Sequence, residues 1–371
     1  MPIITRTKMP ICPLPHVALH FHYQRGPEPR LPERRPVMAH LPTQFKQALE
    51  NIEPKADKVN APDAHKQVRA ALEADDVLSS YDIDPILIGS YKRDVSIRRI
   101  KDVDVFARMT SLPDDVTAHQ ILSRFFNVLD AEFGNDAEGN PRVERQDRSL
   151  KVRFPDYDMH VDAVPARPRS DDTWEIPRRG YDNEWVQTNP DKLTSLATEM
   201  NTAHSGLYKP VVKLMRQTRR ALRGNAKPGG LFIELVTYTA FDTGRVAGND
   251  VAEYYTSALR AASDIIDDIV THGTVLSDPT LPGAAVKFRA TDQQMDLLND
   301  AFKNAAATAE DALAEPDEGK AAKAWRALLG CNGDDEIVFP MPDGFDENGK
   351  RRAFSIVAGA SEVPAGKRDF G

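Results

Sequence analysis

The sequence predicts an α+β protein in which a mixed sheet with helices is followed by a helical lobe, with a cleft between the two. Two observations lead to this fold class. Apolar and alternating segments between about residues 86 and 165 have the period of β-strands. From about residue 203 almost to the end of the chain, apolar residues recur instead at the spacing of helices.

The bulk composition bounds the class of protein. The 371 residues are 41% hydrophobic and 28% charged, which is ordinary for a soluble globular protein of roughly two to three domains. No apolar run approaches the roughly 18 residues that a membrane span needs, and no signal peptide is evident. The two cysteines, Cys12 and Cys331, lie near opposite ends, as expected in a reducing compartment. The net charge of -8 argues against broad nucleic-acid binding and favours a cytoplasmic enzyme with small anionic substrates.

The predicted organisation has four parts. Residues 1–40 are rich in Pro and Arg and predict a disordered leader, and Met38 leaves a later natural start of the protein open. The first lobe is expected over 41–195, the helical lobe over 196–330, and a C-terminal segment with a flexible tail over 331–371.

Helices are predicted where apolar residues recur three or four positions apart, as Phe45, Leu49 and Ile52 do. The expected helices cover about 43–52, about 63–77, a segment from a cap at Asp114 or Asp115 to Leu129, then 207–215, 231–241 and 251–270, with further helices from near Asp292 and Lys320.

A short buried strand, Ile86 to Ile88, ends at Gly89-Ser90. Small side chains at this point let backbone N–H groups approach a ligand closely. Together with the Ser90 hydroxyl, such amides can hold phosphate groups. The sequence therefore predicts a phosphate-binding loop here, and a plain tight turn is the alternative.

Two carboxylates follow on the next predicted strand. Asp102 and Asp104 alternate with Val103 and Val105, so that both carboxylates lie on one face, roughly 7 Å apart. Such a pair repels itself unless a cation lies between its members, and a divalent metal is the simplest reason to build it. A half-exposed strand without a metal is the alternative.

A β-hairpin is predicted further along the chain. Its first strand, Leu150 to Phe154, alternates apolar with basic residues, and a Pro-Asp pair begins the turn. The returning strand carries Asp158, His160 and Asp162 on one face. Asp158 is expected at the hairpin end, and His160 facing solvent or beside the site rather than in it.

Gly-Ser, a short spacer and Asp-x-Asp on a strand resemble the active-site signature of the polymerase-beta-like nucleotidyltransferases. The resemblance implies their palm fold and the transfer of a nucleotide from a nucleoside triphosphate (NTP). It also implies two Mg²⁺ ions, or Mn²⁺, bridged by Asp102 and Asp104. Asp162 matches the third carboxylate of this pattern, which would complete the ion on the hydroxyl side and accept a proton.

The helical lobe narrows the resemblance. The segment from Tyr208 to Arg216 resembles the spine helix of oligoadenylate-synthase-like and bacterial cGAS/DncV-like enzymes (CD-NTases of the SMODS type). Lys213 matches the lysine that reaches the donor triphosphate in that family. The segment from Gly230 to Val236 resembles the family's next helix start, which implies that Phe232 lies near the donor base. A later Asp-Pro pair at Asp278 is also similar.

The loop between the Gly-Ser pair and the carboxylate strand is strongly basic. This charge either attracts the triphosphate or forms an ordinary solvated surface. The basic residues are Lys92, Arg93, Arg98, Arg99 and Lys101.

The resemblance implies an enzyme that joins NTPs into a cyclic or short linear oligonucleotide second messenger, in bacterial anti-phage signalling through a separate effector. Two alternatives stay open: template-independent nucleotide addition to an RNA or protein acceptor, and a non-catalytic module of the same fold. In some members of the family the terminal residue is conjugated through an E1-like partner. The chain ends in Gly371, which is compatible with conjugation, and a frayed terminus is the other interpretation.

Overall fold

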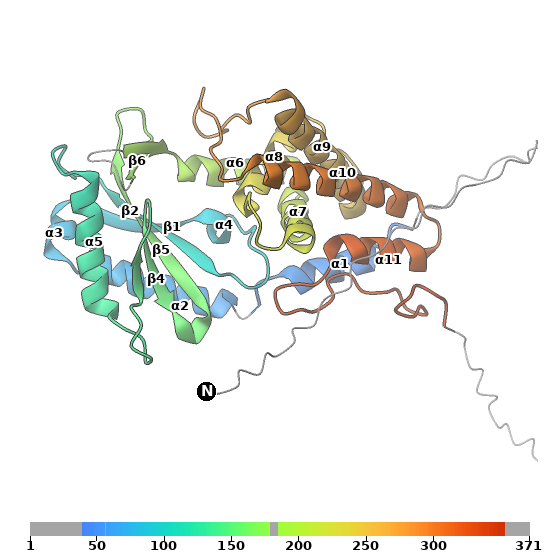
Figure 1. The fold of residues 1–371 in the computed structure, drawn as a ribbon, viewed down its shortest axis with the longest axis horizontal. Helices are drawn as coiled ribbons and strands as arrows, with labels where there is room; N and C mark the ends of the chain where they lie inside the picture. Colours follow the sequence, from blue (N-terminus) through green and yellow to red (C-terminus); the bar gives the residue numbers. More distant parts are fainter. Residues whose placement is uncertain (1–38, 56, 179–184, 353–371) are drawn as a thin grey trace, which may run out of the picture.

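The computed structural model describes residues 39–55, 57–178 and 185–352. They form a lobe built on a sheet and a lobe built of helices, which lie next to each other along the long axis of the molecule (Figure 1). The predicted α+β fold is confirmed. The leader expected over 1–40 lies outside the described residues except for Ala39 and His40, and so do Cys12 and the expected flexible tail that ends at Gly371. Within the described ranges, none of the helices combines the length and apolar character that a bilayer crossing requires.

One sheet organises the first lobe. Its strands are β1 (Ile83–Ile88), β2 (Asp102–Met109), β3 (Val143–Arg145), β4 (Leu150–Phe154), β5 (Met159–Pro168), β6 (Trp174–Pro177) and β7 (Trp185–Thr188). The order is β1-β2-β5-β4-β3, and the β6-β7 hairpin continues from β5. β2 and β5 are parallel, whereas β1 and β4 run antiparallel to them. Parallel neighbours need a long crossover, which here contains helix α5 (Ala118–Phe133), β3 and β4.

The core of this lobe lies between the sheet and two helices, α2 (Asp57–Glu73) and α5. Val103, Val105 and Val161 are completely buried in it. Because side chains alternate along a strand, the carboxylates between these valines face the other side of the sheet. The predicted hairpin is confirmed as β4 and β5, joined by a single 3₁₀ turn at Pro155–Tyr157.

Two details of the first lobe differ from the predictions. Thr117, and not Asp114 or Asp115, caps α5: its hydroxyl accepts from the Gln120 N–H, and the Gln120 side chain accepts from the Thr117 N–H. This reciprocal pair satisfies two backbone donors, which a lone aspartate further upstream does not do.

The second difference concerns the helix expected over 63–77. α2 begins earlier and ends at Glu73, and Val77 lies in a separate short helix, α3 (Asp76–Ser80), where it is 38% exposed. The side chain of Asp75 accepts from the Leu78 N–H and so starts a new helix at this point.

The second lobe is helical, as predicted. Its helices are α6 (Pro190–Ala203), α7 (Tyr208–Arg223), α8 (Gly230–Asp242), α9 (Val251–His272), α10 (Asp292–Ala314) and α11 (Glu318–Leu329). The predicted starts of α9 and α10 are confirmed, and α11 starts two residues before Lys320 because Asp317 caps it.

Helix α1 (Pro42–Ile52) packs in the core of the second lobe, although the first lobe was expected to begin at residue 41. The Phe45 ring lies edge-on to the rings of Trp325, at 5.0 Å between centroids, and Phe339, at 5.1 Å. The amphipathic pattern predicted the helix but could not indicate which core would receive its apolar face.

The loop after the short helix α4 (Gly89–Lys92) is fastened to the second lobe. The Arg98 N–H donates to the Ile52 carbonyl at 2.6 Å, and the Arg98 carbonyl accepts from Arg220 Nη1 at 2.6 Å. Arg98 and Arg99 both form ion pairs with Asp334, in the segment that follows α11. The loop therefore lies within the first lobe along the chain, but in the folded protein it forms part of the contact between the two lobes.

We expect Phe45→Ala to lower the free energy of unfolding by about 3–5 kcal/mol, because it leaves a cavity among buried aromatic rings. Urea unfolding followed by circular dichroism measures this loss. The exposed neighbour Lys46 provides the control, since Lys46→Ala should change little. A loss below about 1 kcal/mol for Phe45→Ala would contradict the placement of α1 in this core.

Candidate active site

The Gly-Ser loop lies directly against the first carboxylate strand. Ile88, the last residue of β1, is the register partner of Asp104 on β2. Gly89 follows with φ +77°, and a Cβ atom at this position would overlap the Asp104 carboxylate. Glycine is therefore required both by its backbone conformation and by the close approach of Asp104. The Ser90 hydroxyl lies 3.0 Å from the Ser96 hydroxyl at the other end of the loop.

The three predicted carboxylates occupy one face of two adjacent parallel strands. Asp104 and Asp162 are register partners on β2 and β5, and Asp102 pairs with His160. Paired residues on neighbouring strands have side chains on the same face, so Asp162 lies beside Asp104 as predicted. His160 Nε2 is 3.8 Å from Asp162 Oδ2, which places His160 beside the carboxylates.

These carboxylates carry negative charge that their surroundings do not balance. Burial raises the pKa of Asp104 to about 7, with a further contribution from the charges of Asp102 and Asp162, although Arg93 and Arg216 act in the opposite direction. Burial, and then the charge of Asp102, raises the pKa of Asp162 to about 6. One oxygen of Asp162 is buried without a hydrogen-bond partner. A group of this kind gains from a nearby cation.

The donor atoms suit a hard divalent cation, since all of them are carboxylate oxygens. Among the described residues, no three His, Cys, Asp or Glu side chains already meet in a geometry that would hold a metal ion. Mg²⁺ is commonly held by one or two carboxylates together with water and substrate phosphates, rather than by a complete protein cage. The residues present therefore fit such an ion as partial ligands.

A cleft of about 490 Å³ opens in front of the loop and the strand. Its lining combines the two lobes: loop and strand residues of the first lobe face residues of α6, α7, α8 and the segment before α10. The lining residues are Ile88, Gly89, Ser90, Arg93, Asp102, Asp104, Thr188, Asn189, Pro190, Leu193, Arg216, Gly230, Leu231, Leu235, Asp278 and Thr280. The cleft that the sequence predicted between the lobes thus contains the Gly-Ser pair, both β2 carboxylates and Asp278.

Two arginines face the carboxylates, one from the predicted basic loop and one to which the sequence analysis gave no role. Arg93 belongs to the loop after α4, and Arg216 projects from α7. Both interact with the buried carboxylate of Glu234 on α8. Gly230 contributes by its lack of a side chain, because a Cβ atom there would lie 3.1 Å from the Arg216 guanidinium.

Lys213, expected to reach the donor triphosphate, does not line the cleft. It is 5% exposed, and its ammonium group bonds Glu53 at the end of α1 and Asp94, at 3.2 Å from the latter. Arg216 is one helical turn further along α7 and does line the cleft. We correct the assignment accordingly: Arg216 is the cleft cation of this helix, and Lys213 joins α7 to the first part of the chain. The Lys-x-x-Arg spacing was the signal that could have indicated it.

Phe232, expected near the donor base, lies in the core. It is 3% exposed, and its ring centroid is 4.5 Å from that of Phe288. Leu231 and Leu235 line the cleft instead, four positions apart on one face of α8, and Leu231 is 52% exposed. The orientation of α8 about its axis therefore places the aliphatic Leu231, and not the neighbouring aromatic Phe232, in the cleft lining.

The basic loop is largely committed to ion pairs within the protein. Arg93 pairs with Glu234, Arg98 and Arg99 pair with Asp334, and Lys101 pairs with Asp158 at 3.0 Å. Asp158 ends the hairpin turn, as predicted, with a left-handed backbone. Lys92 is exposed. Most of the positive charge of this loop, for which triphosphate attraction and a solvated surface were both expected possibilities, therefore forms ion pairs within the protein.

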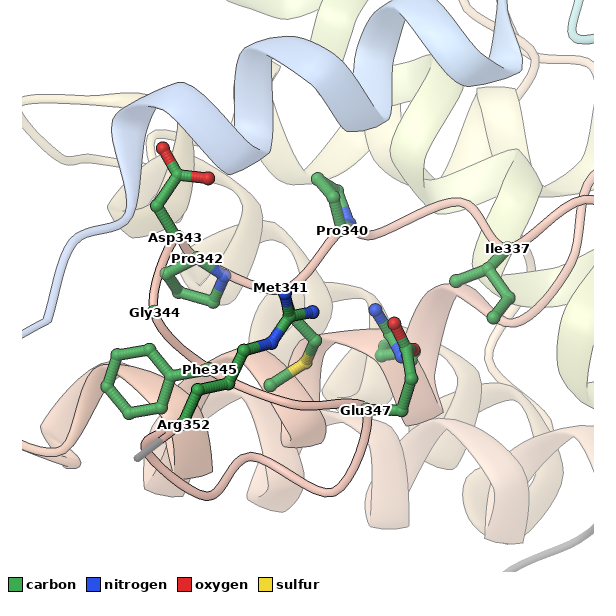
Figure 2. A pocket seen from close by; sticks show the side chains of 10 residues that line it. Ile337, Pro340, Met341, Pro342, Asp343, Gly344, Phe345, Glu347 and Arg352 are labelled. Carbon is green, nitrogen blue, oxygen red and sulfur yellow. The ribbon is translucent and has the colours of Figure 1, made fainter. Parts of the chain in front are cut away.

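A second cavity, of about 350 Å³, lies in the segment after α11 (Figure 2). Arg326, Ile337, Met341, Phe345 and Glu347 are among its lining residues. Nothing in its lining coincides with the predicted site residues.

Three features of this site are together typical of nucleotidyltransferase folds. They are a loop suited to phosphate binding, carboxylates on neighbouring strands, and arginines that face these carboxylates in a cleft between the lobes. Residues 39–201 match the family model of the Second Messenger Oligonucleotide or Dinucleotide Synthetase domain, SMODS. The chain thus contains a SMODS domain and is homologous to cyclic oligonucleotide synthases, in agreement with its predicted resemblance to the bacterial cGAS/DncV-like nucleotidyltransferases.

Known relatives agree with this placement. The chain is 29% identical over 300 residues to a cyclic AMP-AMP-AMP synthase of an Acinetobacter strain, covering 77% of this chain and 83% of that protein. Its fold resembles Escherichia coli CdnC solved with ATP, with a TM-score of 0.60 and 20% identity over 78% of this chain and 98% of that one. It also resembles Bradyrhizobium diazoefficiens CdnG solved with GTP, with a TM-score of 0.60 and 17% identity over 80% and 97% of the two chains.

We expect Arg216→Met to weaken ATP binding by about 10–100-fold, because a charged hydrogen bond to phosphate is worth about 1.5–3 kcal/mol. Lys213→Met should leave ATP affinity within about 3-fold and lower the melting temperature, because the ion pairs of Lys213 with Glu53 and Asp94 are lost. Calorimetric titration with ATP and Mg²⁺, together with thermal unfolding, separates the two effects. Equal losses of ATP affinity in the two variants would contradict the reassignment.

Proposed function

We propose that the protein is a metal-dependent nucleotidyltransferase that joins NTPs into a cyclic oligonucleotide with release of pyrophosphate. One observation carries this proposal: Gly89 and Asp104 touch on one wall of a cleft, and Arg216 lies on the other. A loop that admits phosphates, a carboxylate with unbalanced charge and a cation are the elements that phosphoryl transfer needs.

The residues of the cleft have separate roles in this reaction. Ser90 and the neighbouring backbone amides hold the donor phosphates, which the small side chains allow to approach closely. Arg216 supports the triphosphate from the opposite wall, since its buried Nε has no hydrogen-bond partner in the described protein and can donate. Mg²⁺ ions bound by Asp102, Asp104 and Asp162 would neutralise the triphosphate and lower the pKa of the attacking hydroxyl.

The transfer step is an in-line displacement. The hydroxyl oxygen of the acceptor nucleotide attacks the α-phosphorus of the donor, the bond to the bridging oxygen breaks, and pyrophosphate leaves with that electron pair. Asp162 accepts the hydroxyl proton. Lys151 on β4 is the register partner of Asp162 on β5. It places a positive charge on the side of the carboxylates where the acceptor nucleotide would bind. Repetition of this step, followed by attack of the last hydroxyl on the first α-phosphorus, closes the ring.

The relatives favour adenine nucleotides among the substrates, and a role in anti-phage signalling is proposed because the sequence resemblance implies it. The similar Acinetobacter enzyme is a cyclic AMP-AMP-AMP synthase, and E. coli CdnC has been solved in a complex with a HORMA protein. On this basis ATP is the proposed donor, a separate effector senses the product, and a regulatory protein partner is expected. Conjugation of the terminal Gly371 to another molecule through an E1-like partner is also kept as a proposal.

The test incubates the purified protein with the four labelled NTPs and Mg²⁺, followed by phosphatase. We expect a small phosphatase-resistant oligonucleotide that contains AMP, and no product in EDTA. Labelled RNA or labelled protein as the main product would contradict the proposal. Absence of any product, with and without a HORMA-type partner, would also contradict it.

We expect Asp104→Asn to reduce turnover by about 100-fold or more, because the amide removes an anionic ligand at the centre of the site. In EDTA the same variant should melt a few degrees higher than the wild type, since it removes a partly buried charge beside two other carboxylates. Asp158→Asn, at the exposed hairpin end, is the control and should change neither quantity appreciably. A lower melting temperature of Asp104→Asn in EDTA would show that this charge is balanced in the folded protein.

A further inference from the structure

Glu234 is one of the most deeply buried charged groups described in this protein. Its side chain is 1% exposed, on the core side of α8. Carboxylates are seldom buried so completely unless they are paired. Arg93 forms a forked contact with it, from Nε at 2.6 Å and from Nη2 at 3.0 Å. Arg216 adds a third contact from Nη1, at 3.3 Å.

The three residues come from different parts of the chain. Arg93 follows the Gly-Ser loop of the first lobe, whereas Arg216 and Glu234 lie on α7 and α8 of the second. The Arg93 N–H donates to the Gly89 carbonyl at 3.2 Å. The contact between Arg93 and Glu234 therefore fixes the phosphate loop against the helical lobe through one intervening residue.

Glu234 also determines where Arg216 points. One end of the guanidinium bonds Glu234, Gly230 leaves space beside it, and Nε stays without a hydrogen-bond partner in the described protein. The two arginines would repel each other in this buried place if no anion lay between them. The negative charge of Glu234 lets both arginines occupy the same wall of the cleft. The two positive charges and the one negative charge leave a net charge of about +1 opposite the β2 carboxylates.

We propose that Glu234 is a positioning residue that aligns Arg216 and, through Arg93, the Gly-Ser loop for phosphoryl transfer. It does not line the cleft, so that it would act through the two arginines and not by contact with the substrate. This inference rests on the proposed function. It assigns Glu234 an effect on the rate of transfer beyond its contribution to stability.

A matched cluster elsewhere in the protein gives the control. Asp334 is a carboxylate of the second lobe that pairs with two arginines of the same loop, Arg98 and Arg99, and its side chain is 18% exposed. Neither of these arginines lines the cleft. Removing the charge of Asp334 disturbs an interlobe ion pair in the same manner as removing that of Glu234, but away from the proposed chemistry.

The experiment compares Glu234→Gln with Asp334→Asn in the full chain. Both should lower the melting temperature. Glu234→Gln should reduce kcat by about 10–100-fold with the KM for ATP within about 3-fold, because the arginines keep their charge and lose their alignment. Asp334→Asn should keep kcat within about 2-fold of the wild type.

Glu234→Asp covers the case in which Glu234→Gln does not fold. It keeps the charge, but it is one methylene shorter and cannot reach both arginines, so kcat should again fall at least 10-fold while KM changes little. A kcat within 2-fold of the wild type in either folded variant would overturn the inference, as would an equal loss in Asp334→Asn. An inactive wild type would instead overturn the proposed function, and this inference with it.

Discussion

Repulsion among the carboxylates of β2 and β5 is the constraint on which the rest of this structure depends. Asp104 is partly buried between the Gly-Ser loop and Asp162, and burial together with the neighbouring carboxylates raises its pKa, so the protein alone tolerates its charge poorly. The arginines on the opposite wall offset part of that charge. The remainder is available to a substrate that brings cations with it, so the same imbalance that costs stability favours binding.

Because these charges face each other across the cleft, the two lobes must be held in register. Several contacts do this: α1 inserts its apolar face into the second core, Lys213 joins α7 to Glu53 and Asp94, and Asp334 holds the loop after α4. The loop between the phosphate-binding pair and the carboxylates is therefore part of the interface between the lobes. This explains why Arg93 and Arg98 of the loop are turned toward the second lobe and largely shielded from solvent.

The lining of the cleft also indicates which side chains are available to hold the base of a bound nucleotide. Leu193, Leu231 and Leu235 contribute its aliphatic part, and the lining residues that the structure describes include no aromatic side chain. The polar groups nearby are Asn189 and Asp278, whose carboxylate accepts from the Thr280 N–H and hydroxyl. Apolar contact and a small number of polar groups are the usual means of selectivity in such sites.

The sequence by itself determined what depends on local pattern: the strand that ends at Gly89, the alternation of Asp102 and Asp104 with valines, the hairpin that returns with Asp162, and the helices of the second lobe from α7 to α11. These follow from periods of two and of 3.6 residues, which neighbouring residues set. Only the tertiary structure decided that α1 packs in the second core, that Arg216 rather than Lys213 faces the cleft, and that Leu231 rather than Phe232 lines it. Those outcomes depend on helix rotation and on partners more than a hundred residues away, such as Glu53 for Lys213, and no local spacing contains that information.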